Sequence, residues 1–267
     1  MKILPLWTGA LLALAVSACT STPKETENTS ATVEYGNPAA PGFNEAGSDP
    51  KAIALADSVM KALGGRKAWD DTRYIQWNFL GRRNLLWDKH AQRARIEDPN
   101  QELVYILDLE NNQGQIAQHG QLLEDQKVVD SLVARGKSMW INDSYWLVMP
   151  FKLKDSGVTL KYQGEAYTKD STAAEVIQLT FENVGDTPDN RYRIYIDPAT
   201  YRVAQWEFFR TADSETPAIQ SLWQDYRRYG NILLSGKREQ YLLDNIAVME
   251  SVADSLFQST ELLLGAE

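Results

Sequence analysis

Residues that could support catalysis or bind a metal are few and widely separated. The sequence has two histidines, His90 and His119, and one cysteine, Cys19. A zinc site using both histidines would need carboxylates from elsewhere in the chain. The adjacent carboxylates at 70–71 and 124–125 do not face a common point, because neighbouring residues on a helix or loop diverge. No nucleophile elbow, P-loop or dinucleotide glycine motif is present. We therefore expect no enzymatic activity, no metal and no cofactor.

The chemistry that the sequence does suggest is acylation of the Cys19 thiol. Lys2 precedes an apolar run over residues 3–16, which ends in the tetrapeptide VSAC at 16–19. This run is shorter than the roughly 20 apolar residues of a permanent membrane helix, and it is typical of a removable export signal. The tetrapeptide resembles the lipobox of bacterial lipoproteins, in which the cysteine receives a diacylglycerol before cleavage frees its amine.

The lipobox resemblance implies that residues 1–18 are a signal peptide and that Cys19 is the lipidated first residue of the mature chain. An ordinary secretory signal with a chance cysteine is the alternative. Cys19 is the only cysteine, so no internal disulfide can form in an oxidising compartment, and acylation explains why the thiol is there. Burial of acyl chains such as palmitate would then anchor the protein to the membrane, at roughly 0.8 kcal/mol per CH₂.

The charge of the chain narrows the choice of partners. Removal of residues 1–18 takes away one lysine and no acid, so the formal net charge changes from −9 to −10. An acidic surface repels phosphate backbones, so we expect no nucleic-acid partner. We expect a membrane-anchored lipoprotein of the cell envelope, in the outer membrane, with the periplasmic and surface-exposed sides both left open.

Composition divides the mature chain into a tether and a domain. Residues 19–48 contain the lipidated cysteine followed by a stretch rich in Thr, Ser, Pro, Asn, Glu and Gly, which cannot bury enough apolar surface to fold. We predict a flexible tether there and a single domain over residues 49–267. No internal repeat or low-complexity insert divides this domain.

Apolar periodicity predicts two helices. The first has Asp49 as its cap and Pro50 at its first position, and it ends at Gly64-Gly65. The second covers about 122–135 and stops at Gly136, with a separate helical turn near 144–149 that Pro150 ends.

Most of the remaining chain alternates between apolar and polar residues, as half-buried strands do. The predicted strands are 74–79, 85–87, 92–97, 103–108, 158–163, 176–182, 191–197, 203–209, 222–229, 232–238 and 240–249. The segment DPAT at 197–200 predicts a hairpin turn. The domain is therefore mainly β with an α+β element order. A strongly curved antiparallel sheet whose concave face is covered by helices is the most economical arrangement.

Several segments resemble an uncharacterised family of bacterial envelope lipoproteins. They are GGRKAW at 64–69, YIQWNF at 74–79, RNLLWD at 83–88, YWLVMPFKLKD at 145–155 with Gly157 and Val158, and DSLF at 254–257. The hairpin YIDPAT at 195–200, followed by Val203, Trp223 and Tyr226, is similar to the wider superfamily of periplasmic lipoprotein carriers and outer-membrane lipoprotein receptors. The resemblance implies a half-barrel of about eleven strands with helices closing a hydrophobic cavity, which holds acyl chains in the carriers.

Bulky apolar residues on the predicted strands are candidates for the lining of the concave face. They are Ile75, Trp77, Phe79, Ile106, Phe181, Ile196, Trp206 and Phe208. The alternative for each is a residue that only fills the core of a large sheet.

Three functions follow from these features. The first is non-enzymatic binding or carriage of a lipid or other hydrophobic ligand. It requires space inside the domain, so an interior filled by native side chains would contradict it. The second is a structural or adaptor lipoprotein that presents a surface to an envelope protein complex without a ligand. The third is an enzyme, which would need titratable groups that converge in a pocket.

Overall fold

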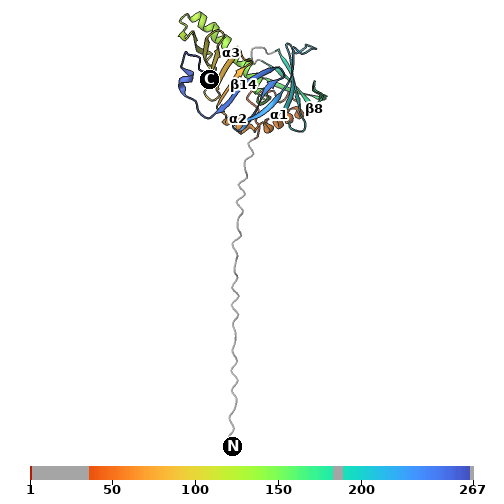
Figure 1. Ribbon diagram of the computed structural model, residues 1–267. Coiled ribbons are helices and arrows are strands. Elements are labelled where there is room, and N and C mark those ends of the chain that lie inside the picture. Colours follow the sequence, from red (N-terminus) through yellow and green to blue (C-terminus); the bar gives the residue numbers. More distant parts are fainter. Residues whose placement is uncertain (2–35, 183–188, 265–267) are drawn as a thin grey trace. The chain divides into compact units, whose positions relative to one another are not determined.

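The computed structural model describes Met1 and residues 36–182 and 189–264. Cys19, the predicted signal peptide and most of the predicted tether lie outside the described residues. Residues 36–264 belong to one compact unit, and the description below concerns that unit (Figure 1).

Nine antiparallel strands form the larger sheet. In spatial order they run β12-β13-β14-β1-β2-β3-β4-β5-β6. Their bounds are β12 Gln224–Tyr229, β13 Ile232–Arg238, β14 Tyr241–Met249, β1 Tyr74–Phe79, β2 Arg83–Asp88, β3 Arg93–Asp98, β4 Leu103–Asp108, β5 Gln113–Gln118 and β6 Gln121–Leu122. Only the pairing of β1 with β14 joins strands that are distant in sequence, with Ile75 opposite Val248. The other pairs are hairpins, which short connections between alternating strands favour.

Five further strands form a second antiparallel sheet in the order β11-β10-β9-β8-β7. Their bounds are β7 Val158–Tyr167, β8 Ala173–Phe181, β9 Arg191–Ile196, β10 Val203–Phe209 and β11 Ile219–Leu222. The predicted turn at 197–200 joins β9 to β10, and the Asp197 carboxylate accepts from the amide of Ala199. Trp223 alone separates β11 from β12, and its amide donates to the carbonyl of Ala204 in β10. The two sheets are therefore connected through Trp223.

Three α-helices accompany the sheets (Figure 1). Their bounds are α1 Pro50–Ala62, α2 Arg66–Asp71 and α3 Gln126–Val148, and the 3₁₀ turns are η1 Met149–Phe151 and η2 Asp254–Phe257. Helix α1 contacts β7 and η1, whereas α3 crosses β3, β4 and β5 and also contacts β13. Across the described residues, no helix combines the length and apolarity needed to span a membrane. One hydrophobic core includes residues of both sheets and of α1 and α3.

The mainly β class is confirmed, but the predicted number of about eleven strands is too low, because the described residues contain fourteen. Strands β5 and β6 were missed. Strand β5 has the sequence QGQIAQ, whose glutamines and glycine hide the apolar alternation. The predicted strand at 222–229 is interrupted at Trp223, where β11 ends and β12 begins.

The predicted break in the second helix is wrong. Helix α3 continues through Gly136, so the helix expected to stop there and the turn expected at 144–149 are parts of one 23-residue helix. A Cβ at Gly136 would lie 2.8 Å from a ring carbon of Tyr105 and 3.2 Å from Leu107. Glycine here permits close contact between the helix and β4, which is a packing role rather than a capping role.

The predicted start of the domain at residue 49 also differs from the structure. The amide of Ala40 donates to Lys154, that of Asn44 donates to Val158, and Phe43 packs on the core. Residues 40–48 therefore lie on the domain, although they belong to the predicted tether. Asp49 does not cap α1 with its side chain; its carboxylate accepts from the amide of Tyr162 at 2.9 Å instead.

A C-terminal segment, residues 254–264, packs on the outer face of β1 to β3. Beneath it, Arg95 and Glu97 are fully buried and form an ion pair of 2.6 Å. The guanidinium also donates to backbone carbonyls at residues 256, 259 and 261. The Glu97 carboxylate accepts from the amides of Leu263 and Leu264, both at 2.8 Å. A buried ion pair thus holds the segment through its backbone.

Candidate ligand-binding interior

A connected group of aromatic rings extends from the buried Trp206 to the exposed Tyr241. Neighbouring ring centroids lie 5.1–6.4 Å apart, and many of the pairs meet edge to face. We call this group the aromatic cluster; its members are Phe79, Tyr145, Trp146, Phe181, Tyr192, Trp206, Phe208, Trp223 and Tyr241. They come from both sheets, from α3 and from the junction at Trp223.

Four of the residues predicted to line the interior belong to the aromatic cluster, namely Phe79, Phe181, Trp206 and Phe208. Three more, Ile75, Trp77 and Ile196, are buried in the same hydrophobic core. The structure therefore places six of the eight residues in or against the hydrophobic core, although their strands come from two sheets. Phe208 is partly exposed and contacts the ring of Tyr192.

Ile106, the eighth residue, lies on the opposite face. Tyr105 and Leu107 of the same strand belong to the core and approach Gly136 of α3. Because successive side chains alternate across a strand, Ile106 points away from the helix. Alternation correctly paired Val104 with Ile106, but both faces of β4 are largely apolar, since Tyr105 and Leu107 belong to the core and Val104 on the other face is also buried. The choice between the two faces was wrong for this strand.

Helix α3 supplies two side chains at the centre of the aromatic cluster. The ring of Trp146 meets Trp206 at 5.2 Å and Phe79 at 5.9 Å, both nearly perpendicular. Tyr145 meets Tyr192 at 5.3 Å. These are ordinary packing distances between rings, so Tyr145 and Trp146 of α3 fill the space between the two sheets here. The expected open cavity is not present between these residues.

Many polar hydrogens of this interior have no acceptor. Among the described residues, the buried and unpartnered indole N–H groups are those of Trp77, Trp87, Trp140, Trp206 and Trp223, and the Tyr105 and Tyr145 hydroxyls are likewise unpartnered. Three of these groups, those of Tyr145, Trp206 and Trp223, belong to the aromatic cluster, whereas Trp87 and Trp140 contact each other outside it. Most buried polar groups in folded proteins form a hydrogen bond. All the indoles are donors without an acceptor function. The interior thus has an excess of hydrogen-bond donors.

A buried arginine adds a positive charge to the same region. Arg238 is fully buried at the end of β13, and its guanidinium carbon lies 3.4 Å from the ring centroid of Trp223. Its Nη2 donates to the carbonyl of Trp146 at 2.6 Å, and its Nη1 donates to Ser235 and Lys237. Burial lowers the pKa of Arg238 to about 9, so the group is charged at neutral pH.

Arg238 was not among the predicted site residues. The available signal was positional, since Leu234, Gly236 and Arg238 share one face of the predicted strand at 232–238 by alternation. Leu234 belongs to the core, which indicates that the arginine at the end of this row points inward.

A second charged contact holds α3. The Asp143 carboxylate of α3 is buried and pairs with Arg83 of β2 through two hydrogen bonds of 2.8 and 2.9 Å. Burial raises the pKa of Asp143, although the pairing with Arg83 opposes this shift. Helix α3 is therefore attached to the strands by two arginines in addition to its apolar contacts.

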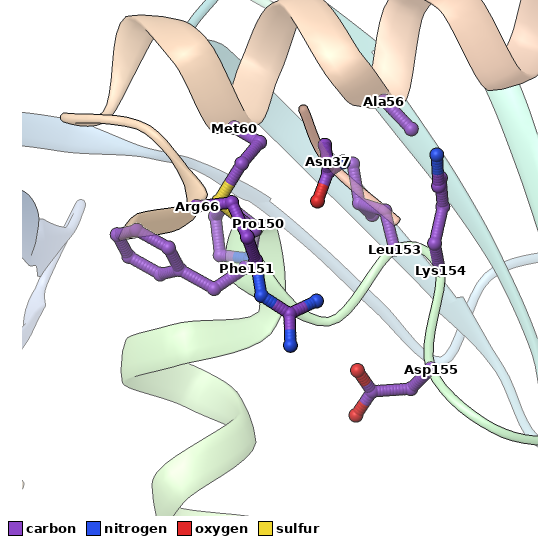
Figure 2. Close-up of a pocket in the computed structure, with 9 residues that line it drawn as sticks. All are labelled: Asn37, Ala56, Met60, Arg66, Pro150, Phe151, Leu153, Lys154 and Asp155. Atoms are coloured by element: carbon purple, nitrogen blue, oxygen red, sulfur yellow. The ribbon is translucent and has the colours of Figure 1, made fainter. Parts of the chain in front are cut away.

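A small pocket lies away from the aromatic cluster, between α1, η1 and the residues after it (Figure 2). It is lined by Asn37, Ala56, Met60, Arg66, Pro150, Phe151, Leu153, Lys154 and Asp155. Its volume of about 10 Å³ accommodates one water molecule, whereas small-molecule sites enclose roughly 300–1,000 Å³. None of the predicted lining residues contributes to it.

The two histidines occupy separate places. His90 bonds to the carbonyl of Asp70, whereas His119 bonds to the carboxylate of Glu102. In the part of the chain that the structure describes, no three His, Cys, Asp or Glu residues are grouped so that they could hold a metal ion.

No protein-family profile matches the sequence, and no curated protein matches it. Among solved structures, a DUF1329 family protein from Desulfovibrio piger has a TM-score of 0.42 at 10% identity, over 79% of this chain and 98% of its own. A putative outer membrane lipoprotein-sorting protein domain from Vibrio parahaemolyticus has a TM-score of 0.40 at 9% identity, over 78% and 96%. MucB has a TM-score of 0.26 at 11% identity, over 79% and 63%.

Proposed function

We propose that the chain is a bacterial envelope lipoprotein, anchored in the outer membrane through acylated Cys19, which binds or carries a lipid or another hydrophobic ligand without enzymatic activity. The binding site in this proposal is the aromatic cluster. The region between residues 1 and 19 supports the anchor, and the donor-rich aromatic interior supports the ligand.

In this proposal, the two sheets together form one strongly curved half-barrel. Every neighbouring pair from β6 through β1 and β14 to β7 is antiparallel, and Trp223 connects the two parts of this succession. Aromatic residues from both parts meet at α3, as the side chains on the concave face of a curved sheet would. Helix α3 is then the element that covers the concave face.

The observation that carries the proposal is the set of unpartnered donors in the aromatic interior. The donors of Tyr145, Trp206 and Trp223 have no acceptor among the described residues, and a buried donor without an acceptor typically costs about 1–3 kcal/mol. A bound amphipathic ligand would supply oxygen acceptors together with apolar surface, whose burial contributes about 25 cal/mol per Å². An interior filled by native side chains contradicts ligand binding while α3 is in place. The proposal therefore requires Tyr145 and Trp146 to leave the aromatic cluster, with α3 as a displaceable cover.

Lipid analysis of the purified protein tests the proposal. The full chain with Cys19→Ala has no covalent lipid, so any lipid in an organic extract is a bound ligand. We expect mass spectrometry to detect a co-purifying lipid, or added lipid to bind with about one molecule per chain. Clean extracts together with no binding of added lipids would contradict the proposal.

A structural or adaptor role in an envelope protein complex is the second candidate. The observation that favours it is the dense packing of Trp146 between Phe79 and Trp206, which leaves no room for a ligand while α3 is in place. Apolar residues that a partner could cover exist, since Leu122 and Val128 are about half exposed near the start of α3. In this role, the protein would bind no lipid and would retain α3 in its present position.

A further inference from the structure

We infer that Arg238 is the receptor for an anionic group of the ligand, so that the domain selects amphipathic molecules with a carboxylate or a phosphate. This inference rests on the proposed function and specifies the chemical class of its ligand. The anion would bind the guanidinium inside the domain, and the hydrocarbon part would occupy the space that Tyr145 and Trp146 now fill.

The first reason is that the charge of Arg238 has only neutral partners. Across residues 36–182 and 189–264, no carboxylate pairs with this guanidinium; it donates to three backbone carbonyls and to the Ser235 hydroxyl. The other fully buried arginine of the described residues, Arg95, has the Glu97 carboxylate at 2.6 Å. Burying a charge without a counter-charge costs free energy, and Arg238 differs in this respect from Arg95.

The second reason is that unpartnered donors surround this guanidinium. The Nε of Arg238 has no acceptor, and neither do the indole N–H groups of Trp223 and Trp206. Trp223 stacks on the guanidinium, and its ring contacts Trp206 at 5.6 Å. A carboxylate or phosphate brings several acceptor oxygens and a negative charge, so one group would satisfy both deficits.

The third reason is that the present partner of Nη2 is replaceable. The Trp146 carbonyl lies at the end of α3, and Pro150, which would donate to it in a continuing helix, has no N–H. The guanidinium of Arg238 therefore donates to a carbonyl that has no donor within the helix. A carboxylate or phosphate would add charge–charge attraction and a second parallel hydrogen bond to the guanidinium, so an entering anion can compete with this carbonyl. The same exchange would release Trp146 from the aromatic cluster.

Binding measurements with matched ligands test the inference. The full chain with Cys19→Ala is titrated with oleate, with oleoyl lysophosphatidate and with oleyl alcohol, which share one hydrocarbon chain. We expect at least one anion to bind about tenfold or more tightly than the alcohol. Preference for oleate identifies carboxylates, and preference for the lysophosphatidate identifies phosphates.

Substitutions of Arg238 test whether this residue causes the preference for an anion over the alcohol. Arg238→Met should lose the preference for the anion and retain the affinity for the alcohol, whereas Arg238→Lys should retain part of the preference. Arg227→Met removes the same charge from an exposed site and should change nothing. Circular dichroism confirms folding, and Arg238→Lys carries the comparison if the methionine variant does not fold.

The outcomes separate the two claims. Equal affinities for anion and alcohol in the wild-type domain, or an unchanged preference in the folded Arg238 variants, would overturn the inference and leave the proposed function intact. If none of the three ligands binds, the proposed function and the inference are both overturned.

Discussion

The Nη2 of Arg238 and the backbone oxygen of Trp146 lie 2.6 Å apart, and this hydrogen bond joins the end of β13 to the end of α3. It fixes the helix at the residue whose indole ring packs against Trp206 and Phe79. One buried charge thus positions the side chain that fills the aromatic cluster. Whether this helix end stays in place or moves separates the carrier from the adaptor role.

Two tryptophans of α3 provide a matched test of the cover. Trp146→Ala should open space inside the aromatic cluster and increase the affinity for a fluorescent fatty acid. Trp140→Ala should not, because Trp140 packs on Trp87 outside that cluster. The Trp146 variant should also lose about 3–5 kcal/mol of unfolding free energy in urea titrations. Equal affinities of both variants and the wild type would argue for the adaptor role.

Cys19→Ala tests the anchor. Without the thiol no diacylglycerol can be attached, so we expect the protein to leave the membrane fraction for the soluble fraction. Metabolic labelling with palmitate should mark the wild-type chain and not the variant. A variant that still fractionates with membranes as the wild type does would show that something other than acylation holds the protein there.

Gly136→Ala tests the contact between α3 and β4. Alanine is the better helix former by about 1 kcal/mol, yet its Cβ would lie 2.8 Å from the Tyr105 ring. We expect a net loss of about 1–3 kcal/mol in unfolding free energy, because both side chains are held in a packed core. Ser131→Ala, at an exposed position of the same helix, should cost nothing. A more stable Gly136 variant would refute the close contact.

Glu97→Gln tests the buried ion pair under the C-terminal segment. The variant leaves the charge of Arg95 unpaired, which typically costs about 3–5 kcal/mol. We expect this loss in urea unfolding, together with faster proteolysis at residues 254–264. The control is Glu102→Gln, since Glu102 is exposed and bonds to His119 at the surface. Similar proteolysis of both variants would show that the ion pair does not hold the segment.

The lowered pKa of Lys89 predicts that the stability of the domain depends on pH. Burial lowers the pKa of Lys89 from 10.5 to about 8, and its ammonium lies 4.5 Å from the Trp69 ring centroid. Below pH 8 the group is charged in the folded and unfolded states, so its desolvation penalty is fully present. Between pH 8 and 10.5 the unfolded chain binds the extra proton, so the folded state gains stability as the pH rises.

The free energy of unfolding of Lys89→Met should therefore exceed that of the wild type by about 1–3 kcal/mol at pH 7. This difference should shrink as the pH rises from 8 to 10. Lys67→Met changes a lysine that is 66% exposed, so its effect should not vary over this window. A Lys89 effect that stays constant with pH would contradict the lowered pKa.

Local patterns in the sequence were sufficient for most of the secondary structure. Alternation located most of the strands, and Pro50 with Gly64-Gly65 located α1, because these signals depend on neighbouring residues alone. The same signals placed six of the eight predicted residues in or against the hydrophobic core. They failed for β4, where both faces are apolar and packing against the distant helix α3 decides which face joins the core.

The errors at Gly136 and Asp49 have one physical origin. Each residue type has a common local role, helix ending for glycine and capping for aspartate, and each is used here for a contact with a strand distant in sequence. Gly136 meets Tyr105, and Asp49 binds the amide of Tyr162. Local propensity is weak compared with such tertiary contacts.

The sequence by itself determined a mainly β domain, the helix at its start and the aromatic character of its interior, because composition and periodicity encode these directly. Only the tertiary structure decided that α3 fills this interior and that Arg238 lies beneath its end. The reason is that packing and charge burial depend on contacts between residues of separate elements. The spacing of residues along the chain does not show which of these distant residues are in contact.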